Sequence, residues 1–169
     1  MRDPIRLVRP DPDLLGAALE GDQALARAIG HDVVAGWATF TDALQPKRDA
    51  LGAQPDAAAW GPRFFVTGNP PELVGWGGFK APPADGVVEL GYEIAESRQG
   101  RGLATAATRA MVAEALADAR VGVVIAHTLP ERNASNRVLE KVGFRFDGGA
   151  REGDKPVWRF SLTRPAGGV

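Results

Sequence analysis

The segment "RQGRGLATAATRAMVAEAL", residues 98–116, constrains the fold of this chain more than any other segment. It follows the strand-like run "VVELGYEI", places glycines at 100 and 102, and continues into an alanine-rich stretch of helical composition. Glycine adopts positive φ angles without steric cost, so two of them allow a tight strand-to-helix turn. N–H groups at the start of a helix also bind phosphate or pyrophosphate. The segment therefore predicts either a plain tight turn or a phosphate-binding loop.

The residues after the glycines argue against two common phosphate-binding loops. A nucleoside-triphosphate loop needs Gly-Lys-Ser/Thr at the helix start, whereas Leu103 and Ala104 follow Gly102. A dinucleotide-binding unit prefers a third glycine where this chain has Thr105, and an acidic residue at the end of the following strand. The nearest acidic residues fall outside that strand. The triphosphate loop is therefore excluded, and the dinucleotide unit is disfavoured.

The rest of the chain alternates between strand-like and helical patterns. Runs of β-branched and aromatic residues bounded by Gly, Pro and Asn indicate strands, and apolar residues three or four apart indicate helices. This order predicts a mixed α/β sheet with a central βαβ unit. Strands are expected over 5–10, 63–67, 73–80, 87–94 and 121–129 and in a hairpin within 144–163, and helices over 11–30, part of 32–53, 103–119 and 134–142.

Two of these elements carry a more specific pattern. In the 103–119 helix, apolar residues form one stripe that we expect to face the core. The run "VGVVIAHTL", residues 121–129, is apolar throughout, which is typical of a strand buried on both faces. The expected stripe consists of Leu103, Ala106, Ala110, Ala113 and Ala117.

The amino-acid composition indicates which kinds of partner the protein binds and in which compartment it is found. Lys and Arg number 20 against 21 Asp and Glu, so the net charge of −1 does not favour nucleic acid or an anionic membrane. The chain has no cysteine, which excludes disulfides, a thiol nucleophile and thiolate metal sites. No run approaches the length of a membrane span or of a signal peptide's apolar region. We expect a soluble cytoplasmic domain with a small-molecule partner and no metal.

Two segments resemble the GNAT N-acetyltransferase superfamily. They are "GYEIAESRQGRGLATAA" and "HTLPERNASNRVLEKVGFR", which lie in the family's order within roughly residues 87–148. The second segment is most similar to the subgroup that includes ribosomal-protein N-terminal acetyltransferases. The resemblance implies an α/β (α+β) single domain with a mixed, mostly antiparallel twisted sheet, helices on both faces and a splayed central strand pair. Its parts would be an acceptor-side portion (about 1–62), an acyl-CoA-binding core (about 63–148) and a C-terminal hairpin (about 149–169).

The resemblance implies acetyl-CoA as co-substrate. The strand that contains Ile94 would splay from the one that contains Val124, and the pantetheine arm would pair with the exposed strand edge. Asn133 would contact pantetheine, although many subgroup members have the asparagine one position earlier. The side chains of Arg98 and Arg101 either meet CoA phosphates or stay solvated. Backbone N–H groups at the pyrophosphate would come from Gln99, Gly100, Arg101, Gly102, Leu103 and Ala104, with Thr105 at the helix start.

Acetyl transfer to an amine needs a proton acceptor and stabilisation of an oxyanion. Glu89 and Glu93 lie four positions apart on one strand, so regular alternation places both carboxylates on the face opposite Leu90, Tyr92 and Ile94. Either carboxylate could take the ammonium proton, and we favour Glu89. Alternatively, both are exposed acids on an open sheet. A backbone N–H near Ile94 would meet the oxyanion.

The departing CoA thiolate needs a proton donor. Many relatives use a tyrosine at the position where this chain has Leu139. The resemblance suggests Ser135 as the substitute, while Ser135 or Asn133 is equally suited to cap the 134–142 helix. His127 ends the 121–129 strand and either faces the site or is structural.

The sequence thus predicts an acetyl-CoA-dependent N-acetyltransferase that acts on a primary amine, either a peptide N-terminus or a small-molecule amine, by direct attack in a ternary complex. A non-catalytic acyl-CoA-binding sensor or regulatory module is the alternative, and a nucleotide-dependent oxidoreductase that uses the glycine loop is a weaker one. A homodimer through the sheet edge or the C-terminal hairpin is plausible.

Overall fold

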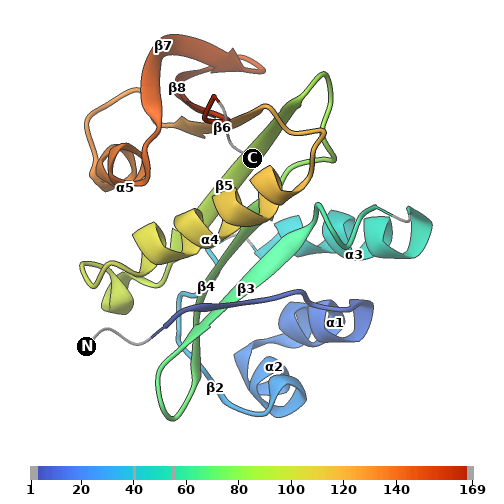
Figure 1. The fold of residues 1–169 in the computed structure, drawn as a ribbon. Coiled ribbons are helices and arrows are strands. Elements are labelled where there is room, and N and C mark those ends of the chain that lie inside the picture. The colour runs from blue at the N-terminus through green and yellow to red at the C-terminus, as the bar shows by residue number, and fades with distance from the viewer. Residues whose placement is uncertain (1–3, 40, 55, 167–169) are drawn as a thin grey trace.

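The computed structural model describes residues 4–39, 41–54 and 56–166, which form one open sheet flanked by helices (Figure 1). The strand order is β1-β3-β4-β5-β6-β8-β7, and β2 pairs with β4. Only the β2–β4 and β5–β6 pairs are parallel. The strands are β1 (Arg6–Val8), β2 (Asp32–Val33), β3 (Pro62–Thr67), β4 (Glu72–Phe79), β5 (Val87–Ile94), β6 (Val123–Thr128), β7 (Arg145–Glu152) and β8 (Lys155–Thr163). The mixed, mostly antiparallel sheet expected from the sequence is confirmed.

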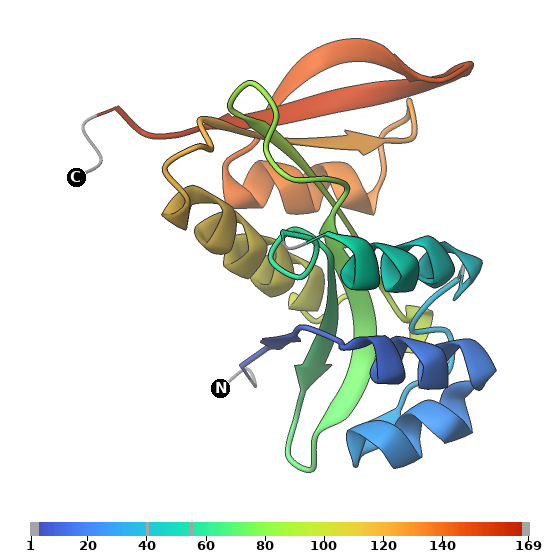
Figure 2. The same ribbon diagram turned by 90° about the vertical axis from the view of Figure 1, so that its right-hand side faces the viewer.

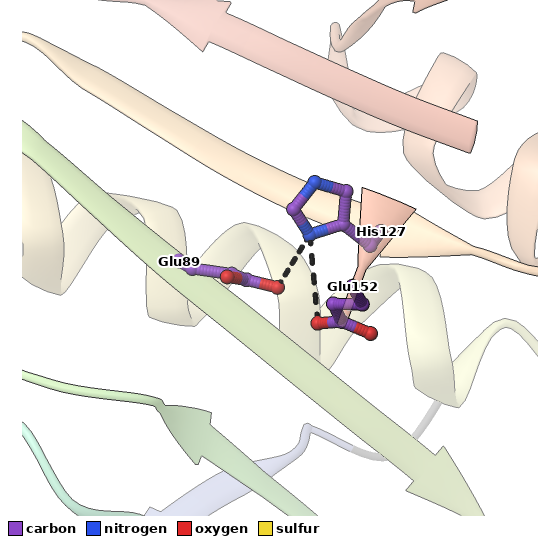
Figure 3. A group of neighbouring side chains, drawn as sticks. All are labelled: Glu89, His127 and Glu152. Atoms are coloured by element: carbon purple, nitrogen blue, oxygen red, sulfur yellow. Dashed lines mark hydrogen bonds and ion pairs between the residues drawn. The ribbon is translucent and has the colours of Figure 1, made fainter. Parts of the chain in front are cut away.

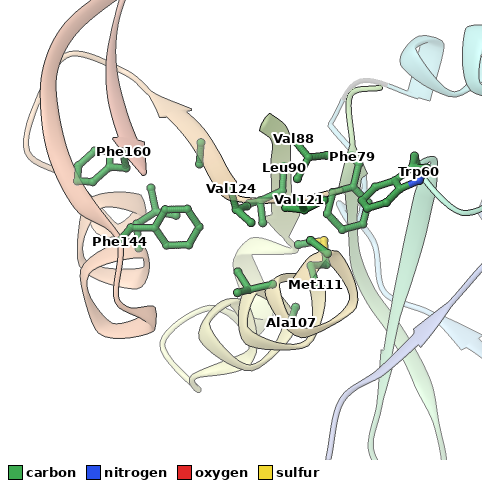
Figure 4. Packing of buried hydrophobic residues seen from close by; sticks show 14 of the residues in the cluster. Trp60, Phe79, Val88, Leu90, Ala107, Met111, Val121, Val124, Phe144 and Phe160 are labelled. Carbon is green, nitrogen blue, oxygen red and sulfur yellow. The ribbon is translucent and has the colours of Figure 1, made fainter. Parts of the chain in front are cut away.

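Helices cover both faces of the sheet (Figure 2). One buried cluster, which includes Leu90, Met111 and Leu139, lies between the sheet and helices α4 and α5 (Figure 4). A second cluster, which includes Leu15 and Phe64, lies between the sheet and helices α1 to α3. Among the described residues, no helix is both long and apolar enough to cross a membrane. The helices are α1 (Pro12–Glu20), α2 (Asp22–Ile29), α3 (Leu44–Ala53), α4 (Leu103–Ala117) and α5 (Ala134–Val142), with short 3₁₀ turns η1 (Thr41–Ala43) and η2 (Glu96–Arg98).

The N-terminal helical segment is two helices and not one. Asp11 caps α1 through a 2.7 Å hydrogen bond from the backbone N–H of Leu14. At Gly21 the backbone turns to φ 139° and ψ 171°, which no helix accommodates, and α2 starts at the next residue. Gly30 then ends α2 in the left-handed conformation, as the sequence predicted.

The buried face of α4 differs from the predicted stripe. Ala107, Met111 and Ala115 are fully buried, whereas Ala113 and Ala117 are exposed. In an alanine-rich helix several faces have a similar apolar content, so the larger side chains decide which one packs, because they bury more apolar area. With Met111 and Val112 in the core, the buried face lies about one residue further along the helix than the predicted stripe.

Strand β6 is fully buried on one face only, which corrects the expectation of burial on both. Val124, Ala126 and Thr128 are buried, whereas Ile125 and His127 are partly exposed. The reason is that α1, α2 and α3 pack over β1 to β4 and contribute no contact to β6 in their cluster. The final hairpin also has longer strands than expected, since β7 and β8 leave only residues 153 and 154 for the turn.

The central pair of strands is splayed, as predicted. Strand β5 pairs with β6 only through Val87–Glu89, opposite Val123–Ile125. From Leu90 to Ile94 it pairs with β4 instead, while β6 continues beside β8 to Thr128. A gap therefore opens between the carboxyl-terminal halves of β5 and β6 (Figure 1).

Candidate active site

The glycine loop joins the end of β5 to the start of α4 through two left-handed residues. Gly100 has φ 76° and Gly102 has φ 79°, and Gly102 is the N-cap of α4. A side chain at either position would be strained, because L-residues rarely adopt positive φ. The backbone N–H groups of Leu103, Ala104 and Thr105 lie in the first turn, where an α-helix has no internal acceptor for them. The loop thus has the geometry of an anion site at a helix N-terminus.

Strand β5 directs unpaired backbone groups into the gap. The carbonyl of Glu89 accepts a 2.9 Å bond from Lys80 on the β4 side, and the N–H of Ala95 donates a 2.8 Å bond to Val74 on the same side. Because strand backbone groups alternate in direction, those of Tyr92 and Ile94 face the gap. The side chain of Gln99 donates a 3.0 Å hydrogen bond to the Ile94 carbonyl, which leaves the Ile94 N–H facing the gap.

The two arginines near the loop differ in their surroundings. Arg98 binds both carboxylate oxygens of Glu72, at 2.6 and 2.9 Å, and this hydrogen bonding lowers the pKa of Glu72. The side chain of Arg98 therefore links η2 to β4. Arg101 is exposed and has no carboxylate within 4 Å among the described residues, so it is the arginine left available to a phosphate.

Glu89 and Glu93 lie on the same face of β5, as the alternation predicted. The β4–β5 register is continuous from Leu90 to Ile94, and Glu93 lies opposite Trp76. Leu90 and Ile94 point the other way into the cluster under α4. Both carboxylates therefore face the side of the sheet that carries α1 to α3.

Glu89 belongs to a cluster with His127 of β6 and Glu152 of β7 (Figure 3), which Lys80, the residue after β4, joins as a fourth member. Its Oε1 lies 2.7 Å from Nδ1 of His127 and 2.7 Å from Nζ of Lys80. Glu152 on β7 approaches His127 Nδ1 at 3.7 Å and also forms an ion pair with Lys80. Burial opposes the charge on Lys80, but the two carboxylates outweigh it and raise the Lys80 pKa, while Lys80 lowers that of Glu152. Oε1 of Glu89 is thus in contact with both Lys80 and His127.

Three members of this cluster have the composition of a metal-binding group. Ligand atoms of Glu89, His127 and Glu152 all lie within 4.8 Å of one another. The Lys80 ammonium, however, already forms ion pairs with both carboxylates, so a metal ion would have to displace a cation that is part of the chain. The cluster is explained without a metal as an ion-pair network that joins β4, β5, β6 and β7.

Glu93 lines a pocket of about 230 Å³ between α3 and strands β4 and β5. Gly91 lies in the lining and leaves its face of β5 open, with no atom within 4 Å of the place where a Cβ would stand. The backbone N–H of Thr39 donates a hydrogen bond to Oε1 of Glu93. The lining residues are Lys47, Pro62, Trp76, Gly77, Gly78, Phe79, Lys80, Gly91, Tyr92 and Glu93.

The start of α5 lies across the gap from β5. Asn133 is the N-cap of α5, and its side-chain oxygen accepts a 3.2 Å hydrogen bond from the Asn136 N–H. Within the described part of the chain, the hydroxyl of Ser135 makes no hydrogen bond, while its carbonyl accepts one of 3.3 Å from Tyr92. Leu139 is fully buried in the core, away from solvent. Capping is therefore assigned to Asn133, and the Ser135 hydroxyl is left unused.

Sequence reasoning missed Lys47, Lys80, Trp76 and Glu152 as site residues. Glu152 and Lys80 are 72 residues apart, and no spacing pattern connects them. Lys47 belongs to a weakly patterned helix that the sequence placed only within 32–53. These contacts arise from strand order and helix docking, which local sequence does not encode.

A family model described as "Acetyltransferase (GNAT) domain" matches residues 5–145, and the chain belongs to this family. It is 26% identical over 143 residues to the uncharacterized N-acetyltransferase YjdG of Bacillus subtilis (strain 168), covering 83% of this chain and 85% of that protein. The chain is therefore an acyltransferase, and acetyl-CoA is its co-substrate.

Solved structures show the same fold at low sequence identity. The aminoglycoside acetyltransferase AAC(6')-Ib with ribostamycin and coenzyme A is 20% identical, with a TM-score of 0.64 and coverage of 97% of this chain and 94% of that one. The microcin C7 self-immunity acetyltransferase MccE with acetyl-CoA and AMP is 15% identical, with a TM-score of 0.67 and coverage of 95% and 93%.

Proposed function

We propose that this protein transfers the acetyl group of acetyl-CoA to the nitrogen of a primary amine, by direct attack in a ternary complex. One observation carries the proposal, which is the position of strand β5 between two features. The glycine loop and the gap lie at its carboxyl-terminal end, and the Glu93 pocket lies on the face that carries α1 to α3. Both substrates can therefore reach the same strand from opposite faces. The structure of AAC(6')-Ib, which has a similar fold, holds ribostamycin and coenzyme A together.

For the co-substrate, we assign the pyrophosphate to the backbone N–H groups of Gly100–Ala104 and the first turn of α4 at Thr105. The predicted contribution of Gln99 is dropped, because its N–H donates a 3.2 Å hydrogen bond to the carbonyl of Glu96. The positive φ angles of the loop glycines and the helix N-terminus support this assignment. The pantetheine arm would pair with the exposed edge of β5, and the Ile94 N–H would stabilise the oxyanion. Asn133 can contact pantetheine only through atoms that its capping bond leaves free.

For the proton acceptor, the contacts favour Glu93 over the Glu89 that the sequence favoured. Glu93 lines the pocket, whereas Glu89 is bound by Lys80 and His127. Lys80 and His127 both contact Oε1 of Glu89, so this oxygen is already occupied and is not open to an incoming amine. Glu93 would take one proton from the incoming ammonium, and the neutral amine would then attack the thioester carbon.

For the leaving group, we assign the proton donor to Ser135. As the nitrogen–carbon bond forms and the carbon–sulfur bond breaks, Ser135 gives its proton to the CoA sulfur, and the second proton lost by the amine nitrogen restores the hydroxyl. The Ser135 hydroxyl is not needed as a helix cap, and the positive end of α5 also favours a nearby thiolate. The products are the N-acetylated amine and free CoA thiol.

Three finer points stay predictions. The ribosomal-protein subgroup rests on the segment "NASNRVLEKVGF" alone. A homodimer through β7 is supported by its position at the sheet edge and by the exposed side chain of Phe146. A cytoplasmic location rests on composition.

Titration calorimetry with acetyl-CoA tests the proposed binding site, with NAD and ATP as controls. We expect acetyl-CoA alone to bind, and Gly102→Trp to lose binding at least about tenfold because its side chain would stand at the anion site. Gly153→Trp is the matched control, since Gly153 also has positive φ (60°) but lies in the β7–β8 turn. Equal binding by the Gly102 variant, or preference for NAD, would overturn the assignment.

A further inference from the structure

Lys47 is an unpaired cation in the wall of the Glu93 pocket. Its Nζ donates a 3.2 Å hydrogen bond to the carbonyl of Phe79, which is a neutral acceptor. No carboxylate of the described residues lies within 4 Å of it. Burial, and then the positive charge of Lys80, lower the pKa of Lys47, as expected for an ammonium that has lost water without gaining a counter-ion. Burying such a charge costs free energy that a bound anion would offset.

Lys80, the other cation in the pocket wall, cannot replace Lys47 in this role. Its ammonium is paired with both Glu89 and Glu152, so the cluster around it carries two carboxylates for one lysine. An incoming anion would meet those carboxylates at Lys80 and would be repelled. Lys47 is therefore the cation in the described lining that is free to bind an anionic group.

Glu93 supplies the opposite charge in the same pocket. Its carboxylate accepts the Thr39 N–H on one oxygen and lies in the lining together with Lys47. A ligand that matches both side chains has a cationic amine and an anionic group in one molecule. The two lysines of the lining would repel a polycationic sugar or a polyamine, so the charges favour a ligand with one amine and one anionic group.

We propose that the acceptor is a small amine that carries a carboxylate, as an amino acid does, and that Lys47 determines this specificity by binding the carboxylate. This inference rests on the proposed N-acetyltransferase function. The ammonium of the acceptor lies toward Glu93 and its carboxylate toward Lys47. The reaction converts the amino acid and acetyl-CoA into an N-acetylamino acid and CoA thiol, with no other reactant.

Matched acceptors test the proposal. CoA thiol release is measured with L-amino acids and with the corresponding L-amino-acid amides, which keep the amine and lose the carboxylate charge; spermidine and kanamycin serve as polycationic acceptors. We expect at least one amino acid to exceed its amide about tenfold or more in kcat/KM, the effect of one charge-assisted hydrogen bond. Lys47→Met should abolish this preference, Lys47→Arg should keep most of it, and the exposed-residue control Lys141→Met should leave it unchanged.

The outcomes separate this proposal from the proposed function. If acetyl-CoA binds and the amides or polycationic amines are acetylated as well as the amino acids, or if Lys47→Met keeps the preference, the carboxylate assignment is wrong while the acetyltransferase assignment stands. If acetyl-CoA does not bind, the proposed function fails first. Calorimetric binding of the same amino acids to the wild type and to Lys47→Met then still tests the carboxylate site, and equal or absent binding overturns it.

Discussion

Nδ1 of His127 lies 2.7 Å from Oε1 of Glu89, although 38 residues separate them in the chain. The contact joins β5 to β6 beyond their last backbone pair, and Lys80 binds the same Glu89 oxygen. Glu89 therefore holds the strands together where the gap begins. This relationship separates the two glutamates of β5 into a positioning residue and a residue that faces the acceptor pocket.

The first prediction concerns this division of roles. Glu93→Gln should lower kcat about 10²-fold or more, the usual contribution of a general base, while the Kd for acetyl-CoA stays unchanged. Glu89→Gln should lower kcat less and reduce stability, because it removes the carboxylate charge that pairs with Lys80 and leaves only Glu152 to pair with it. Steady-state kinetics and urea denaturation of both variants measure these effects. A larger kcat loss in Glu89→Gln would restore Glu89 as the base.

The second prediction separates the two polar residues at the start of α5. Ser135→Ala should lower kcat about 10²-fold with little change in stability, because Asn133 provides the cap. Asn133→Ala should instead cost about 1 kcal/mol of stability, the usual value of an N-cap. Thermal denaturation and turnover of the two variants, compared side by side, check the assignment. Unchanged turnover in Ser135→Ala would show that its hydroxyl gives no proton to the thiolate.

The third prediction concerns Arg63, whose side chain is fully buried. Its guanidinium binds Glu114 of α4 at 2.9 Å and backbone carbonyls of the segment before β3, including that of Ala59 at 2.6 Å. Arg63→Met should lower the free energy of unfolding by about 3–5 kcal/mol, because several buried acceptors lose their donor. Urea denaturation measures this loss.

Glu114→Gln is the control for that measurement. It removes the charge and keeps an acceptor oxygen on a partly exposed side chain, so it should cost much less than Arg63→Met. Equal losses in the two variants would mean that the ion pair, and not the carbonyl contacts, carries the stabilisation.

The fourth prediction uses the only tyrosine of the chain. Burial raises the pKa of Tyr92 from 10.0 to about 12 in the folded protein. The unfolded state releases this proton first as the pH rises, so the contribution of Tyr92 to stability should be constant below about pH 10 and be lost between about pH 10 and 12. Tyr92→Phe lacks this contribution. Urea denaturation across this range should give curves that diverge for the two proteins, and parallel curves would contradict the burial effect.

Local sequence determined the elements around the co-substrate. A strand, two glycines and an alanine-rich helix in succession specify a turn with positive φ angles and a free helix N-terminus, because these properties depend on neighbouring residues only. Regular alternation along β5 likewise placed Glu89 and Glu93 on one face. Two motifs in the family's order were enough to identify GNAT membership, which the match over residues 5–145 confirms.

Tertiary structure alone decided which polar groups meet. The buried face of α4 followed the volumes of Met111 and Val112 and not the alanine spacing, because packing selects among faces of similar hydropathy. The approach of Glu152 to Lys80 depends on the order of the strands, and that of Lys47 to the Glu93 pocket depends on how α3 docks. The separation of two residues along the chain does not predict such contacts, because distant segments come together only when the strands and helices pack around the core.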